Sequence, residues 1–400
     1  MDQQKLEKLL SEIPDKQRMI FRRLEEISES STSIHNKDES FACHLEKSEE
    51  QLFNKNSLKL KIYLDTNFWI SLRDVQLSRP KSNDDSLLLD KLLKLNAAGK
   101  IICPISDTIF FELLKQKDKS TKIAMAKIID ILCHGTIIKS YFDRLSIEFY
   151  HFLRFAETGT TPPELPAEKH IWSKIPYLLG AFIFTAKQNN DIQDIINKYT
   201  YDFISEIRLS EFMEMLDNNV FQDVNDDFDA WIGITRSMNV QKRANDTRNP
   251  GINSLHADEI AGLIGVMENQ LGQIMLQVLK AAYGDRVPIC VDEKDRQLVV
   301  EGAKKVIYNI FKFKKNKMAM WLPTYHVTAI LNAAMRKDLK RNFKPNDFFD
   351  FKHASAAMPY CDIFATDKPL AVLLRSGELQ LDKKYNTKVV TNTQELLSLL

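Results

Sequence analysis

Short apolar runs rich in β-branched and aromatic residues occur near both ends of the chain, and a helical pattern follows each of them. The runs are LKLKIYLD at 58–65, IICPIS at 101–106, CDIFAT at 361–366 and KVV at 388–390. Residues of these types favour strands, and strands that alternate with helices are typical of a parallel sheet covered by helices. The chain is therefore expected to be an α/β protein whose sheet is built from both ends of the sequence.

Long helical patterns dominate the middle of the chain, from about residue 140 to residue 345, and strand signals are sparse there. Apolar residues recur at helical spacing in WSKIPYLLGAFIFTAKQ at 172–188, HADEIAGLIGVMENQLGQIMLQVLKAAY at 256–283 and DRQLVVEGAKKVIYNIFKFKK at 295–315. The sequence thus predicts a mostly α-helical insertion that interrupts the α/β fold.

The expected domain organisation has four parts. An N-terminal arm, 1–57, combines short helical patterns with a polar stretch from Ser28 to Asn56 that is expected to be a linker or weakly ordered. The α/β domain occupies 58–140 and 340–400, and the helical insertion occupies 141–339 between its two parts.

Composition restricts the class of protein. The chain has 400 residues, of which 44% are hydrophobic, enough for a substantial core. The 55 basic residues nearly balance the 54 acidic ones, so the protein is not a polycation, and any contact with nucleic acid must be local. The five cysteines lack the spacing of a zinc site and are expected to be free thiols in a reducing compartment. Since no apolar segment has the length of a membrane span, we expect a soluble cytoplasmic protein without membrane contact.

Five carboxylates are positioned where such a fold gathers its functional groups. Asp65 directly follows the first strand, Glu112 lies six residues beyond the second, and Asp350 lies in the helical pattern NDFFDFKHASAA. Asp362 and Asp367 bracket the next strand, with Asp367 at its carboxyl end. Functional groups of parallel α/β sheets collect at the carboxyl ends of the strands, so these side chains are expected to converge.

Carboxylates that converge repel each other unless a cation is present, and oxygen ligands suit Mg²⁺ or Mn²⁺. Such ions activate water and stabilise the leaving oxygen in phosphodiester cleavage. We therefore predict a catalytic metal centre with the ligands Asp65, Glu112, Asp350 and Asp367, and Asp362 as a further candidate. A simpler interpretation is that Asp65 and Asp367 only cap the helices that follow them.

Polar residues next to these acids are expected to orient ligands or water rather than react. They are Thr66, Asn67, Ser106 and Thr366. His353 follows Asp350 by three residues, on roughly the same helix face, which suggests a general base. The alternative is that His353 is simply packed and hydrogen-bonded in the interior.

A basic stretch from Lys304 to Lys344 holds eleven Lys or Arg residues and one acid, Asp338, with aromatic residues such as Phe311, Phe313 and Trp321 interleaved. That composition suits contact with a phosphate backbone and stacking on bases. The alternative is a solvated helix face whose aromatic residues, Phe311, Phe313 and Trp321, lie in the core. The candidate nucleic-acid ligands are Lys312, Lys314, Lys315, Lys317, Arg336, Lys340 and Arg341.

Three segments together resemble the PIN domain family. YLDTNFWI resembles the opening motif, a first strand that ends in Asp-Thr-Asn, and ISDTIFFELL is similar to the second motif, a Ser and Thr before a helix that carries a Glu. DFKHASAAMPYCDIFATDKPLAVLL resembles the C-terminal motif. The resemblance covers about 140 residues, roughly 60–138 and 340–400, and the 237 residues between Glu112 and Asp350 imply a helical insertion.

The resemblance implies a Rossmann-like α/β/α core and a ribonuclease that depends on Mg²⁺ or Mn²⁺, a class that includes toxins paired with protein inhibitors. Asp65, Glu112 and Asp350 match the first three acidic positions of the family, and Thr66 and Asn67 match its polar residues after the first. The family usually places its last acid two residues after the Thr, where this chain has a lysine. The choice between Asp362 and Asp367 is therefore open.

The leading hypothesis is a metal-dependent endoribonuclease of the toxin or defence type. Two alternatives are a DNA-directed nuclease of the related flap-endonuclease type and a non-catalytic PIN-like scaffold that binds RNA or a protein. A phosphatase of the haloacid dehalogenase type would need a second Asp where this chain has Asn67. No GxGxxG follows any strand, which argues against dinucleotide binding.

Overall fold

The structure is a computed structural model that describes residues 40–178, 197–198, 201–202, 204–215, 226–244, 251–284 and 292–400. The helical patterns expected before Ser40, most of the pattern at 172–188, and Cys290 lie outside the described residues. Cys103, Cys133 and Cys361 are free thiols, as expected.

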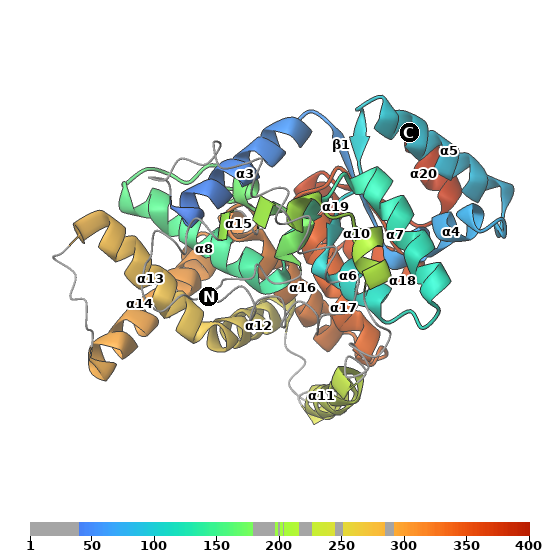
Figure 1. Cartoon of the computed structure of the whole chain (residues 1–400). Helices are drawn as coiled ribbons and strands as arrows, with labels where there is room; N and C mark the ends of the chain where they lie inside the picture. Colours follow the sequence, from blue (N-terminus) through green and yellow to red (C-terminus); the bar gives the residue numbers. More distant parts are fainter. Residues whose placement is uncertain are drawn as a thin grey trace, which may run out of the picture.

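A four-stranded parallel sheet combines the two ends of the chain, as the strand pattern predicts (Figure 1). Its order is β2 (Ile101–Ile102), β1 (Leu60–Leu64), β6 (Ile363–Ala365) and β7 (Lys388–Val390). The register pairs Leu64 with Ala365 and Ala365 with Val390. Strands β1, β6 and β7 therefore end side by side, and the residues that follow them meet at one edge of the sheet.

The run IICPIS forms two short strands in two different sheets. β2 pairs with β1, whereas β3 (Ile105–Ser106) pairs with β4 (Thr136–Ile138), also in parallel. Pro104 lies between them and has no backbone N–H to donate, so it interrupts the ladder at the point where the strand changes partner.

The second sheet ends in a strand that the sequence pattern does not predict. β5 (Trp172–Lys174) pairs antiparallel with β4, followed by the 3₁₀ turn η2 (Ile175–Tyr177). The prediction of a helix that starts at residue 172 is therefore wrong for its first turns. The backbone of β4 offers β5 hydrogen-bond partners, a tertiary effect that outweighs the local helical period.

Helices pack around the four-stranded sheet and share one hydrophobic core with it. Several begin with a side-chain cap, as at Ser82, whose hydroxyl accepts a hydrogen bond from the Asp85 N–H. These helices are α4 (Thr66–Gln76), α5 (Asn83–Ala97), α6 (Asp107–Leu114), α7 (Lys119–Cys133), α16 (Pro323–Lys337), α17 (Pro345–Ala357), α18 (Lys368–Arg375), α19 (Leu381–Tyr385) and α20 (Thr393–Leu399).

A second hydrophobic core lies among the helices between the two parts of the α/β fold. It is formed by α8 (Tyr141–Glu157), α12 (Ile252–Val266), α13 (Glu268–Tyr283), α14 (Glu293–Phe313) and α15 (Lys315–Trp321). The single helix expected over 256–283 is divided in two at Met267. Helix α16 joins the cores, because Val327 and Leu331 face the sheet core while Tyr325 and Ala329 face the second one.

The polar stretch expected to be a linker contains a helix instead. α3 (Phe41–Asn56) is capped by Ser40 and packs against β5 and η1 (Glu168–His170). Glu49 on α3 forms a buried ion pair with Lys139, directly after β4. These tertiary contacts tie α3 to the second sheet.

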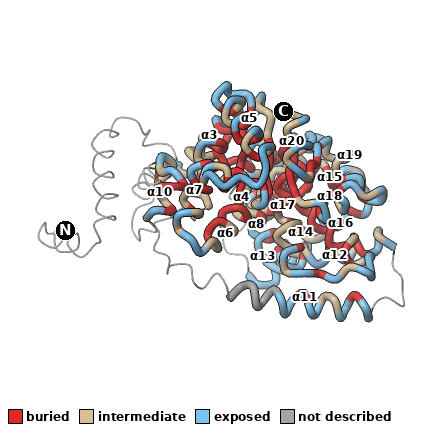
Figure 2. Tube along the Cα trace, turned by 90° about the vertical axis from the view of Figure 1, so that its right-hand side faces the viewer, coloured by how far each residue is buried: buried red, intermediate tan, exposed pale blue. Residues whose placement is uncertain are grey.

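Two further helices lie at the periphery, α10 (Leu209–Met215), which packs on α7, and α11 (Asp226–Ala244). Most of the described residues of α11 are exposed, whereas buried residues concentrate in helices such as α4, α8 and α17 (Figure 2). Asn239 holds α11 to the loop before α17 through two hydrogen bonds with the backbone of Phe343. Among the described residues, no helix is long and apolar enough to cross a membrane.

Candidate metal centre

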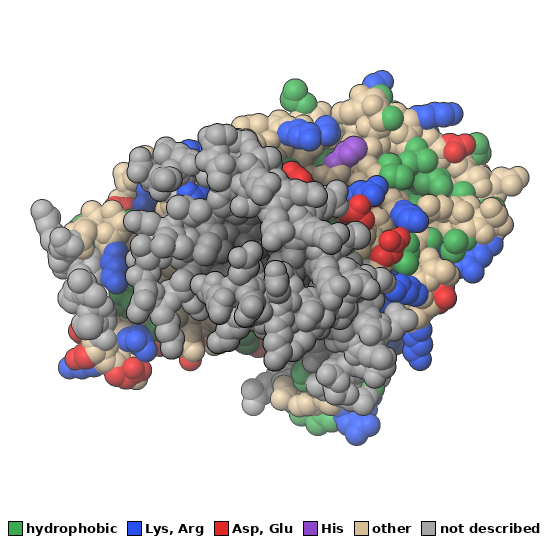
Figure 3. Space-filling view, in the orientation of Figure 1, with side chains coloured by type: hydrophobic (Ala, Val, Ile, Leu, Met, Phe, Trp, Pro, Cys, Tyr) green, Lys and Arg blue, Asp and Glu red, His purple; other side chains and the backbone are tan. Residues whose placement is uncertain are grey.

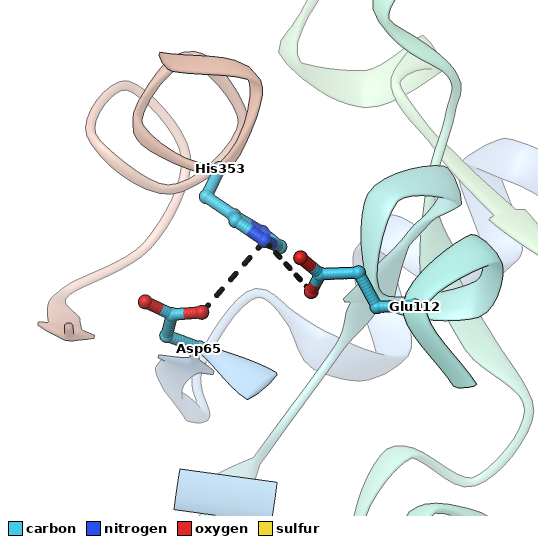
Figure 4. Close-up of side chains that lie close together, drawn as sticks. All are labelled: Asp65, Glu112 and His353. Carbon is cyan, nitrogen blue, oxygen red and sulfur yellow. Dashed lines mark hydrogen bonds and ion pairs between the residues drawn. The ribbon is translucent and has the colours of Figure 1, made fainter. Parts of the chain in front are cut away.

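Three side chains from distant parts of the sequence meet at the carboxyl edge of the four-stranded sheet (Figure 4). Asp65 caps α4 directly after β1, Glu112 comes from α6, and His353 comes from α17. One ligand atom from each lies within 4.8 Å of the other two. This grouping includes two of the predicted acids and His353, which the sequence suggests as a general base or a packed interior residue but not as a ligand.

The carboxylate of Asp65 is buried and oriented through both oxygens. Oδ1 accepts a hydrogen bond from the Thr66 N–H (2.6 Å), and Oδ2 accepts one from the Thr366 hydroxyl (3.0 Å). The Thr66 hydroxyl donates to Glu112. Both threonines therefore orient carboxylates of the cluster, the role expected of them from sequence.

His353 is buried on α17 and makes contacts through both ring nitrogens. Nε2 lies 3.2 Å from Oε2 of Glu112 and 3.7 Å from Oδ1 of Asp65. Nδ1 lies 2.8 Å from the Tyr63 hydroxyl, which in turn lies 2.6 Å from the hydroxyl of Ser106. Ser106 precedes α6, yet its side chain makes no capping bond, since it contacts Tyr63 instead.

The charges in the cluster shift each other's pKa values. Burial alone would lower the pKa of His353, but the charge of Asp65 and the hydrogen bond with Glu112 outweigh it and raise that pKa to about 9. Burial, with the charge of Glu112 adding to it, raises the pKa of Asp65. Burial also acts to raise the pKa of Glu112, but His353 and Thr66 outweigh this and lower it.

Asp350 and Asp367 complete the crowded negative charge at this edge. Burial, followed by the charges of Asp65 and Asp367, raises the pKa of Asp350 to about 7. Asp367 lies at the carboxyl end of β6 and caps α18 by accepting a hydrogen bond from the Leu370 N–H (2.9 Å). The capping interpretation is thus correct for Asp367, whose carboxylate also acts electrostatically on Asp350.

Asp362 lies at the opposite end of the sheet, so its assignment as a ligand of the same centre is wrong. It precedes β6 and accepts a hydrogen bond from the Lys61 N–H (2.7 Å) at the start of β1. Lys61 is four residues before Asp65, and a strand rises about 3.3 Å per residue, so roughly 13 Å separate the two positions. The parallel register therefore places Asp367, and not Asp362, at the carboxyl edge, but Asp367 is not part of the group formed by Asp65, Glu112 and His353.

Two further side chains come from the elements that carry the cluster: Asn67, which was predicted to orient ligands, and Lys115, which was not among the predicted residues. Asn67 is exposed on the first turn of α4. Lys115, one turn after Glu112, holds its ammonium group 4.1 Å from the centre of the Phe349 ring. Lys115 also acts electrostatically on Glu112, and Phe349 directly precedes Asp350 on α17.

The basic stretch does not form one continuous cationic surface. Arg336 pairs with Glu259 and Asp258 on α12, and Arg341 pairs with Asp347 on α17. Lys312, Lys314, Lys317 and Lys340 are exposed, whereas the side chain of Lys315 is outside the described part. On the face shown in Figure 3, outside the grey atoms, Lys and Arg side chains alternate with Asp and Glu.

The aromatic residues of that stretch are mostly structural. Phe311 and Trp321 are buried in the second core, as the alternative interpretation expects, while Phe313 is 67% exposed next to Lys312. The two predicted arginines are therefore paired with acids, and among the predicted residues whose side chains the structure describes, the exposed cations are Lys312, Lys314, Lys317 and Lys340.

Sequence reasoning missed two residues of the site, His353 as a member of the cluster and Tyr63 as its partner. The spacing of His353 after Asp350 was a usable signal, because residues three apart share a helix face. Tyr63 had no such signal, since an aromatic residue inside an apolar strand usually indicates only the core.

The donor set fits a divalent cation. Ligands about 2.1 Å from an octahedral ion lie about 3.0 Å apart when adjacent and about 4.2 Å apart when opposite. The distances of 3.2 and 3.7 Å from His353 Nε2 to the two carboxylates need small adjustments to meet this geometry. The acids at this edge outnumber the single histidine, and a divalent ion could offset part of their negative charge.

Comparisons with known proteins identify no relative: no family model, no curated protein and no solved structure matches this chain.

Proposed function

We propose that this protein is a metal-dependent endoribonuclease with a PIN-like α/β core, in which a divalent ion such as Mg²⁺ or Mn²⁺ is bound at the carboxyl edge of the sheet. The observation that carries the proposal is the convergence of Asp65, Glu112 and His353 within 4.8 Å. Their elements, β1, α6 and α17, are far apart in sequence, so the convergence is a property of the fold.

The arrangement of the residues supports different roles for the acids and for the threonines. Asp65 and Glu112 would bind the ion, with Thr366 and Thr66 holding the two carboxylates in orientation. A divalent ion in such a site activates a water molecule and stabilises the leaving oxygen of a phosphodiester. Asp350 and Asp367 lie near the same acids: burial first, and then the charges of Asp65 and Asp367, raises the pKa of Asp350, and a bound cation would favour its ionised form.

Lys115 supports a nucleic-acid substrate rather than a small phosphate ester. It directly follows the helix that carries Glu112 and lies close to Phe349, so a cation and an aromatic ring come from the segments that carry the acids. Backbone phosphates bind to lysines, and bases stack on aromatic rings. RNA is proposed as the substrate from the PIN-like motifs, and parallel digestion of labelled RNA and DNA distinguishes it from a DNA-directed nuclease.

The experiment compares Asp65→Asn with Asp362→Asn in cleavage of labelled RNA with and without Mn²⁺. The first substitution removes a ligand charge and should abolish metal-dependent cleavage, whereas the second alters an aspartate at the far end of the sheet and should leave cleavage intact. Circular dichroism and thermal unfolding check that both variants fold. Full activity of Asp65→Asn would refute the proposal.

One observation favours a second candidate, a non-catalytic scaffold that binds RNA or a protein. His353 already pairs with Asp65 and Glu112, so these carboxylates are compensated without an ion. Calorimetry at millimolar Mn²⁺ separates the two functions, because a scaffold of this kind would bind no ion and would not cleave RNA.

A further inference from the structure

A buried chain of hydrogen-bonding groups lies behind His353, and the proposed function does not use it. Tyr63 is fully buried in β1. Its hydroxyl contacts both Nδ1 of His353 (2.8 Å) and the hydroxyl of Ser106 (2.6 Å). The rings of Tyr63 and His353 also meet edge to face, with centroids 5.8 Å apart. The imidazole is therefore held by packing and by a hydrogen bond on the side away from the carboxylates.

These contacts determine which nitrogen can bind an ion. Nε2 faces Asp65 and Glu112, and it can coordinate a metal only through its lone pair, so the ring proton must then be on Nδ1. In that state Nδ1–H would donate to the oxygen of Tyr63, 2.8 Å away, and the Tyr63 hydroxyl would donate to Ser106, 2.6 Å away. Tyr63 and Ser106 thus provide the hydrogen-bond partners that the tautomer with Nε2 as a ligand requires.

We propose that Tyr63 and Ser106 are positioning residues that present Nε2 of His353 as a nitrogen ligand, and that the centre therefore prefers a transition ion to Mg²⁺. The proposal rests on the metal-dependent function above. Mg²⁺ binds oxygen ligands and retains waters, whereas imidazole binds later transition ions such as Co²⁺ more strongly. Hydrogen-bond partners of a ligating histidine typically contribute 10–100-fold to metal affinity.

The test measures Co²⁺ and Mg²⁺ binding to the full chain by calorimetry, for the wild type and for Tyr63→Phe. The wild type should bind Co²⁺ more tightly than Mg²⁺. Tyr63→Phe removes only the hydroxyl and should raise the Kd for Co²⁺ by about 10–100-fold, while the Kd for Mg²⁺ changes little. The matched control is Tyr325→Phe, which removes a buried hydroxyl in the second core and should leave both values unchanged.

Proton NMR of the Co²⁺-loaded protein provides a signature that a purely structural role would not produce. The Nδ1–H of a Co²⁺-bound imidazole gives an exchangeable resonance far downfield. It should be present in the wild type, absent in His353→Gln, and lost to rapid exchange in Tyr63→Phe, which lacks the acceptor for this proton. Thermal unfolding of Tyr63→Phe and Tyr325→Phe checks that the variants are folded.

An unchanged preference for Co²⁺ over Mg²⁺ in Tyr63→Phe would overturn this inference, as would the absence of a shifted proton in the Co²⁺-loaded wild type. Asp65→Asn distinguishes this failure from failure of the proposed function. If Asp65→Asn loses RNA cleavage while Tyr63→Phe binds Co²⁺ normally, the nuclease proposal stands and the role of Tyr63 is rejected.

Discussion

Glu148 is fully buried on α8, between the two cores, and its titration should be measurable in the stability of the chain. Its carboxylate accepts hydrogen bonds from the Thr324 N–H (3.0 and 3.1 Å) and from the Tyr360 hydroxyl (2.7 Å). Arg144, one turn earlier, donates instead to the Lys139 carbonyl (2.6 Å) and to a serine of α17. The carboxylate is therefore hydrogen-bonded but has no direct contact with this cation.

The pKa of Glu148 sets how much the free energy of unfolding changes with pH. Burial raises the pKa of Glu148 from 4.5 to about 7, despite the opposing hydrogen bonds. A pKa difference of one corresponds to about 1.4 kcal/mol, so the group is linked to about 3 kcal/mol of stability. Between pH 4.5 and 7 the folded chain holds a proton that the unfolded chain has lost, so the free energy of unfolding falls as pH rises. The contribution is complete below pH 4.5 and absent above pH 7.

The assay is urea unfolding of the wild type and Glu148→Gln at several values between pH 5 and pH 8. Glutamine does not titrate, so the stability of the variant relative to the wild type should increase by about 2.5 kcal/mol across this range. Glu49 and Asp350 also have pKa values of about 7, but their titration is common to both proteins and cancels in the difference. A difference that stays constant with pH would refute the reasoning, because Glu148 would then titrate equally in the folded and unfolded chains.

Two further predictions concern helix packing and the metal centre. A Cβ at Gly272 on α13 would lie 2.5 Å from Cγ2 of Val300, and overpacking outweighs the gain in helix propensity, so Gly272→Ala should lower the free energy of unfolding by about 1–2 kcal/mol. Urea unfolding should show that adding Val300→Ala recovers much of this loss, and a stability equal to wild type in Gly272→Ala alone would contradict the packing. Thr366→Val removes the donor to Asp65 and should weaken Mn²⁺ binding about 10-fold or more in calorimetry. Thr391→Val, at the corresponding position after β7, should not, and equal affinities in both variants would exclude an orienting role for Thr366.

Local chemistry made much of the fold predictable. The β-forming run before Asp65 and the apolar run before Asp367 each end at a carboxylate that caps the next helix, and both patterns depend only on neighbours in sequence. The strand at Trp172–Lys174 was not predictable in this way, because its stability comes from pairing with β4, which lies more than thirty residues earlier. The break at Met267 was missed for a related reason, since the apolar period continues through it.

The sequence by itself determined which residue types end the strands and open the helices, and therefore that acids would collect at one sheet edge. Only the tertiary structure decided the membership of the cluster. The register of β1 with β6 places Asp362 at the amino end of the strands, away from the cluster, and the packing of α17 on α6 brings His353 to Glu112. Capping and strand formation act over a few residues, whereas the distance between side chains 241 positions apart depends on how whole elements pack.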